Sequence, residues 1–181
     1  QFVSAECYAL TGYAPESFIN NKDLSFNDVT SPEYRDVIWN EWGRALEENQ
    51  QLKLEYEITT ASGERKWVLE IGKGIYNEKG EAEALEGIIL DITDRKKMEN
   101  ELIYINEHDS ATGLYNRIYL DNLLINDHKK HLQISRAFIC IDMSTVQSLY
   151  MTYGFNYSQD LIKKIADTLN QYATEKCILV R

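Results

Sequence analysis

The sequence predicts an α+β fold in its first half, then a connecting helix, then an incomplete α/β unit. Three observations support this order. Apolar and polar residues alternate in three stretches between residues 52 and 92, which is the period of strands in an antiparallel sheet. After Thr93 the apolar spacing changes to three and four, the period of a helix. From Asp109 onward, helical and strand-like stretches alternate.

The first half supplies helices before its sheet. Residues 2–13 begin extended and turn helical, ending at Gly12, a residue suited to the left-handed end of a helix. Residues 32–48 form a longer helix with Pro32 in its first turn. The strands are expected at residues 52–60, 66–76 and 84–92, with turn sequences between them. Such a meander packs one face against helices.

The connecting helix is expected over residues 94–107, which are charged and rich in helix formers. Met98, Leu102 and Ile105 follow one another at spacings of four and three, which predicts a narrow seam between two copies of the helix in a homodimer. The alternative is an ordinary amphipathic helix that packs on its own domain, because one or two heptads do not establish a coiled coil.

The second half contains fewer elements than a closed sheet requires. We expect helices at residues 117–128 and 146–172, the latter interrupted near Gly154, and strands at residues 136–142 and 177–180. Two strands and two helices make only part of an α/β domain. The domain is therefore expected to continue beyond Arg181 in a longer parent protein.

Charge and composition exclude several classes of partner. There are 19 Lys and Arg against 29 Asp and Glu, a formal charge of -10, which repels the phosphate backbone of nucleic acids. No apolar run approaches the ~20 residues that span a bilayer, and no signal peptide opens the chain. We expect a cytoplasmic chain, although a membrane segment upstream in the parent protein stays open. Cys7, Cys140 and Cys177 are odd in number and lie in apolar stretches, which predicts buried thiols.

Residues 1 to about 96 resemble a PAS domain of the type followed by a PAC motif. The resemblance depends on four segments in the family's order: LTGY at 10–13, ASGERKWV at 61–68, NEKGE at 77–81 and LEGIILDITDRKK at 85–97. It implies an antiparallel sheet with helices on one face, here assigned to residues 1–94, with the family's usual first strand missing before Gln1. PAS domains are sensors and dimerisation modules.

The PAS resemblance implies that cofactors need checking. A haem of the histidine type needs an imidazole, and all three histidines of this chain follow the PAS-like region. The Asn-Cys-Arg-Phe type motif of photoactive flavin domains does not occur between Asn20 and Trp42. We therefore expect no haem and no flavin. A small-molecule ligand in an apolar pocket, or a domain that serves only as a dimer contact, are the two possibilities left open.

Residues 108–117, HDSATGLYNR, resemble the opening of GGDEF domains, the domains of diguanylate cyclases. That opening is Asp, two variable residues, Thr-Gly-Leu, one variable residue and Asn-Arg, and this chain matches it at Asp109, Thr112, Gly113, Leu114, Asn116 and Arg117. We assign residues 95–108 to the signalling helix and residues 109–181 to the first part of a GGDEF-like domain. Thr-Gly forms a tight turn and Asn-Arg begins the next helix.

The resemblance also implies that nucleotide-reading residues are lost. Active members carry a Mg²⁺-binding Asp at a strand end, and Asp142 retains it. Five residues on they carry a phosphate-binding Lys, eight on a guanine-reading Asn and seventeen on a guanine-reading Asp. This chain has Gln147, Tyr150 and Gln159 at those places. The alternative for Asp142 is an ordinary strand-end carboxylate.

The sequence thus predicts a regulatory protein in which a PAS domain controls a degenerate GGDEF domain, which acts as an adaptor or on a downstream phosphodiesterase-type domain. One alternative is an active diguanylate cyclase that uses Mg²⁺ and makes cyclic di-GMP from two GTP. Another is a ligand-binding sensor without nucleotide chemistry. The sequence leaves open whether the chain is an enzyme, and no catalytic residue is assigned.

Overall fold

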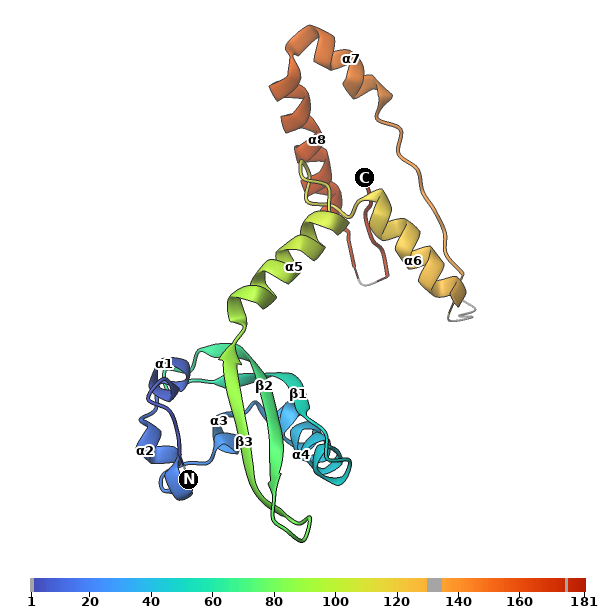
Figure 1. Cartoon of the computed structure of the whole chain (residues 1–181). Helices are drawn as coiled ribbons and strands as arrows, with labels where there is room; N and C mark the ends of the chain where they lie inside the picture. Colours follow the sequence, from blue (N-terminus) through green and yellow to red (C-terminus); the bar gives the residue numbers. More distant parts are fainter. Residues whose placement is uncertain (1, 130–134, 175) are drawn as a thin grey trace. The chain divides into compact units, whose positions relative to one another are not determined.

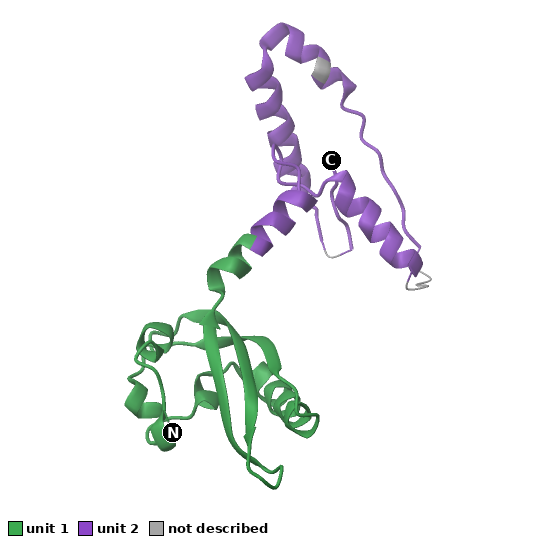
Figure 2. Cartoon of the chain, in the orientation of Figure 1, with its two compact units in different colours: residues 1–98 green, residues 99–181 purple. Residues whose placement is uncertain are grey.

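The computed structural model describes residues 2–129, 135–174 and 176–181. They form two compact units, residues 1–98 and residues 99–181 (Figure 2). Each unit has helices of its own, and among the described residues the sheet belongs to the first unit alone.

The first unit is a three-stranded antiparallel sheet in the order β1-β2-β3, with α4 covering one of its faces (Figure 1). The meander predicted from the alternating pattern is confirmed. Its elements are α1 Cys7–Thr11, α2 Pro15–Phe18, η1 Ile19–Asn21, α3 Phe26–Val29, α4 Pro32–Glu47, β1 Leu52–Thr59, β2 Arg65–Tyr76 and β3 Ala82–Asp91.

Bare glycine backbone on β2 lets α4 approach the sheet closely. The Trp42 ring of α4 lies over Gly72, where an added Cβ would come within 2.5 Å of the ring. Leu46 lies over Gly74 in the same way, at 2.7 Å from the corresponding position. The Trp42 Nε1–H donates a hydrogen bond to Glu70 at 3.2 Å, which fixes the orientation of the indole.

The core of the first unit is centred on Tyr56, Ile58 and Val68, which are almost fully buried. The Tyr56 hydroxyl donates to the second oxygen of Glu70 at 2.8 Å. Burial, together with the Glu70 charge, raises the pKa of the Tyr56 phenol, so it stays protonated as a donor. Trp42 and Tyr56 thus donate to the two oxygens of Glu70, and these hydrogen bonds offset the cost of placing its charge beside the core.

The connecting helix α5 spans Thr93–Glu107, which confirms the helix predicted from the change of period. In the second unit, α6 Arg117–Lys129, α7 Ser144–Tyr153 and α8 Phe155–Asn170 are also helices. Gly154 separates α7 from α8 with a φ of 85°, a left-handed value that favours glycine. Among the described residues, no helix combines the length and the apolar character that crossing a bilayer requires.

Two strands predicted in the second unit are not formed. Residues 136–142 are extended but pair with no strand among the described residues, and Ile139 is 90% exposed. At residues 177–180 only isolated bridges occur, including one between Tyr115 and Val180. An apolar stretch becomes a strand only where a neighbouring strand pairs with it, so the apolar pattern alone was not sufficient.

The prediction of buried thiols was also wrong for two of the three cysteines. Cys140 and Cys177 are exposed, and Cys7 is half-buried. The first two lie in the segments that were expected to be strands. Without a paired strand or a packed layer over them, apolar neighbours in the sequence do not bury a side chain.

The close packing of α4 on the sheet predicts the effect of Gly72→Ala. The added methyl group meets the Trp42 ring, so we expect the free energy of unfolding to fall by about 1–3 kcal/mol. Gly43→Ala is the control, because its Cβ would have open space in α4, and it should raise stability by up to ~1 kcal/mol. Urea unfolding followed by tryptophan fluorescence measures both. Equal effects of the two substitutions would contradict this packing.

Candidate functional site

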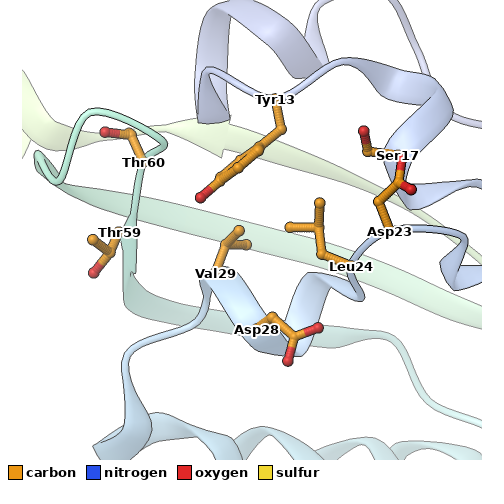
Figure 3. A pocket seen from close by; sticks show the side chains of 8 residues that line it. All are labelled: Tyr13, Ser17, Asp23, Leu24, Asp28, Val29, Thr59 and Thr60. Atoms are coloured by element: carbon orange, nitrogen blue, oxygen red, sulfur yellow. The ribbon is translucent and has the colours of Figure 1, made fainter.

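An open hollow lies beside the sheet in the first unit. Its volume is about 490 Å³, and Figure 3 shows its lining residues, which are Tyr13, Ser17, Asp23, Leu24, Asp28, Val29, Thr59 and Thr60. They come from α2 and the loops on either side of it, from α3 and from the end of β1. Hydrogen bonds from the backbone and side chain of Ser25 lower the pKa of Asp28, so this edge of the hollow carries a negative charge.

Backbone and side-chain hydrogen bonds meet at the joint between β3 and α5. The Trp67 backbone N–H on β2 donates to Thr93 Oγ1 at 3.0 Å, and the Ile92 N–H donates to the Trp67 carbonyl at 2.9 Å. The Thr93 N–H donates to Asp91 at 2.9 Å. The side chain of Ile92 is buried. The helix therefore begins on backbone groups of the sheet, and its first turn cannot shift without breaking them.

Charged side chains surround this joint. Arg95 and Lys96, in the first turn of α5, each lie 2.7 Å from the Glu55 carboxylate on β1. These bonds, that of Lys96 foremost, lower the pKa of Glu55. Lys96 also lies 5.0 Å from the centre of the Trp67 ring, a cation–π distance. The first turn of α5 thus contacts both other strands of the sheet.

Asp91 forms an ion pair at the same joint, with Lys66 at 3.2 Å. Partial burial raises the pKa of Asp91, but the hydrogen bonds from Thr93 and the interaction with Lys66 outweigh burial and lower it overall. The carboxylate therefore stays ionised at neutral pH.

The predicted seam lies further along α5. Met98, Leu102 and Ile105 are 64%, 67% and 63% exposed, so an apolar stripe is available on this helix. Ile103 and Tyr104 are exposed beside it.

The turn from α5 to α6 holds the Asp-x-x-Thr-Gly-Leu-x-Asn-Arg sequence. Asp109 accepts hydrogen bonds from the backbone N–H and hydroxyl of Thr112, at 2.9 and 2.7 Å, and pairs with Arg181 at 2.8 Å. Gly113 has a φ of 72°. Asn116 accepts from the Tyr119 N–H at the start of α6 and donates from its side-chain amide to the Asn106 carbonyl at the end of α5. The turn is therefore bonded to both helices and to the C-terminal segment.

The four family positions for nucleotide and metal lie around α7 and α8. Asp142 accepts from the Ser144 backbone N–H at 2.8 Å and from its hydroxyl at 3.1 Å, which starts α7. Tyr150 packs edge-on against Phe155, Gln159 is half-buried on α8, and the side chain of Gln147 lies outside what the structure describes. No group of three His, Cys, Asp or Glu side chains placed to hold a metal ion occurs among the described residues.

Sequence reasoning identified Asp91, Ile92 and Thr93 as the end of the sheet, but not their partners. Glu55, Lys66 and Trp67 reach the joint through strand register, with Val68 paired to Asp91. The Arg181 contact to Asp109 was missed too, because the two residues are 72 positions apart. No spacing or motif in the sequence indicates this contact.

Comparisons with known proteins agree with this geometry. Residues 1–89 match the PAS fold, and residues 106–181 match the family described as diguanylate cyclase, GGDEF domain. Uncharacterized protein y4lL of Sinorhizobium fredii is 26% identical over 163 residues, which are 85% of this chain and 20% of that protein. Diguanylate cyclase DgcM of Escherichia coli is 27% identical over 96 residues, which are 52% of this chain and 23% of that protein.

Among solved structures, the N-terminal domain of a diguanylate cyclase with a PAS/PAC sensor from Marinobacter aquaeolei superimposes with a TM-score of 0.47 at 19% identity. The match covers 53% of this chain and 86% of that one. The chain thus spans less than a quarter of the length of either relative, and most of this domain structure.

The lowered pKa of Asp91 predicts a pH dependence. The stability that its ion pair contributes is present above the unfolded pKa, whose ordinary value is 3.8, and is lost as pH falls through the lower folded value. The variant Asp91→Asn should therefore be less stable than the wild type at pH 7, and the difference should shrink below about pH 4. Urea unfolding from pH 7 to pH 3 measures it. A constant difference across this range would show that the charge of Asp91 is irrelevant.

Proposed function

This chain carries a PAS fold followed by a GGDEF domain, and we propose that the first regulates the second in cyclic di-GMP signalling. The observation that carries the proposal is the joint at Thr93. The output helix begins on the backbone of Trp67 and on the Glu55 carboxylate, so a change in the sheet displaces the start of α5. At its other end, α5 is bonded to the opening turn of the GGDEF domain.

The PAS domain acts as the sensing part, and its ligand is a small molecule. A small molecule bound in the hollow lined by Tyr13, Asp28 and Thr60 contacts α2, α3 and the end of β1 at the same time. The interior beneath α4 is occupied by Trp42 and Leu46. The proposal includes no haem and no flavin, because no histidine precedes His108 and the flavin-type cysteine motif does not occur.

The GGDEF domain acts as a degenerate, regulatory domain rather than a cyclase, and controls a phosphodiesterase-type domain downstream. Gln147, Tyr150 and Gln159 stand where Lys, Asn and Asp bind phosphate and guanine in active members. Two lost base contacts of about 1.5–3 kcal/mol each lower GTP affinity on the order of a hundredfold to ten-thousandfold. An active cyclase that uses Mg²⁺ remains the competing function, since Asp142 is retained.

The nucleotide part of the proposal is tested by calorimetric titration with GTP and Mg²⁺. We expect no saturable binding at micromolar GTP. The triple variant Gln147→Lys, Tyr150→Asn and Gln159→Asp restores the family residues and should gain about a hundredfold or more in affinity. Titration with ATP is the control for base selection. Tight wild-type binding of GTP in preference to ATP would instead support the active cyclase.

Regulation through α5 also predicts a homodimer, in which Met98, Leu102 and Ile105 of two copies meet. Each side chain removed fully from water contributes roughly 1.5–3 kcal/mol. Leu102→Glu places a charge in the seam and should weaken the dimer at least tenfold in sedimentation equilibrium, because the two carboxylates repel one another. Asn100→Glu, which places the same charge on the opposite, exposed face of α5, is the control. A monomeric wild type at tens of micromolar, or an unaltered dimer in Leu102→Glu, would contradict the seam.

A further inference from the structure

Four aromatic rings are stacked in one column at the second end of α5. Tyr104 and His108 stack with centroids 3.9 Å apart and planes at 14°. His108 and Tyr115 follow at 4.5 Å and 35°, and Tyr115 and Tyr119 at 3.7 Å and 15°. The 4.5 Å separation lies at the short end of the range preferred by aromatic pairs, and the other two pairs are closer still, so neighbouring rings are in direct van der Waals contact. We call these four residues the ring column.

The sequence places two rings of the column on each helix or its flank. Tyr104 and His108 are four residues apart at the end of α5, so their rings lie on one face. Tyr115 lies in the turn just before α6 and stacks on Tyr119 in its first turn. The turn between the helices joins the two pairs, because His108 and Tyr115 form an antiparallel bridge across it.

Hydrogen bonds hold the column at its centre. His108 Nδ1 lies 3.0 Å from the Tyr104 carbonyl, and since a carbonyl only accepts, Nδ1 carries the proton. The Tyr115 carbonyl accepts from the Arg181 backbone N–H at 2.8 Å, so the column is also tied to the C-terminal segment. The middle rings are half-buried, whereas Tyr104 at the end is 54% exposed.

We propose that the ring column is the rigid coupling that passes a displacement of α5 to α6 across the turn. The bonds of Asp109 to Thr112 and of Asn116 to the Asn106 carbonyl hold the turn, but a turn held by single hydrogen bonds still absorbs a rotation of the incoming helix through its φ and ψ angles. With the rings stacked, rotating the last turn of α5 separates His108 from Tyr115, so α6 has to follow. His108 is thus a positioning residue. The inference rests on the proposed function, in which α5 carries the signal.

The experiment weakens the joint at Thr93 and measures the response in α6, on the other side of the ring column. Thr93→Val removes the acceptor of the Trp67 N–H, and amide hydrogen exchange by mass spectrometry or NMR follows the full chain. We expect faster exchange both in the first turn of α5 and at Tyr119, at the start of α6, by about three- to tenfold. In a His108→Ala background, Thr93→Val should still speed exchange in α5 but leave α6 unchanged.

Three further variants separate coupling from folding. His108→Phe keeps a ring in the column and should restore the response of α6. Tyr157→Ala breaks another aromatic pair of the same unit, with Tyr153 at 5.0 Å, and should leave the response intact. If His108→Ala unfolds the second unit, Tyr119→Leu removes the last ring instead, and the first turn of α6 should again stop responding.

Two outcomes would overturn the proposal in distinguishable ways. If α6 responds to Thr93→Val equally with and without the His108 ring, the column is not the coupling, and the proposed function stands. If Thr93→Val changes no exchange even in α5, then α5 does not depend on the joint. That result overturns both the coupling and the regulation proposed for this chain.

Discussion

The hydrogen bond between the Trp67 backbone N–H and Thr93 Oγ1 is the constraint on which the proposed regulation depends. It replaces the strand partner that β2 loses where β3 ends, and so satisfies a backbone donor that is otherwise left unpaired beside the core. The same residue begins α5. A single residue therefore bonds to the end of the sheet and begins the helix, and the position of the helix follows from the position of the strand. The ion pairs around it are partly exposed, and such pairs contribute little individually.

The two ends of α5 are fixed by different physical means. At the first end, backbone hydrogen bonds and the buried Ile92 side chain fix the helix to β2. At the second end, stacked rings and an Asx-type turn at Asp109 fix it to α6. Hydrogen bonds are directional and break over short displacements, and rings in direct contact resist being separated. The exposed stripe of Met98, Leu102 and Ile105 runs along α5 from the joint toward the ring column.

Sequence reasoning predicted what is periodic and local. The alternating pattern predicted β1, β2 and β3, and the change of spacing predicted α5. The glycine at position 154 predicted the interruption between α7 and α8, where the structure has a left-handed φ. It failed where structure depends on distant pairing. The apolar run around Ile139 looked like a buried strand but has no strand partner among the described residues, and Cys140 is exposed with it. In the site, Thr93 and Asp109 could be identified from sequence motifs. Their partners Trp67 and Arg181 could not, because strand register brings Trp67 to Thr93 and a contact between distant parts of the chain brings Arg181 to Asp109.

Native-state hydrogen exchange, measured by NMR over a series of urea concentrations, tests the joint most directly. The Trp67 amide donates to Thr93 Oγ1, and the Ile92 amide donates to the Trp67 carbonyl. Their exchange is compared with that of the amides bonded between β1 and β2. If the first turn of α5 is part of the sheet's cooperative unit, both amides exchange only through unfolding of the whole first unit, with the same free energy and urea dependence as the strands. Exchange of these two amides through a local opening that urea does not affect, while the strands stay protected, would contradict the account.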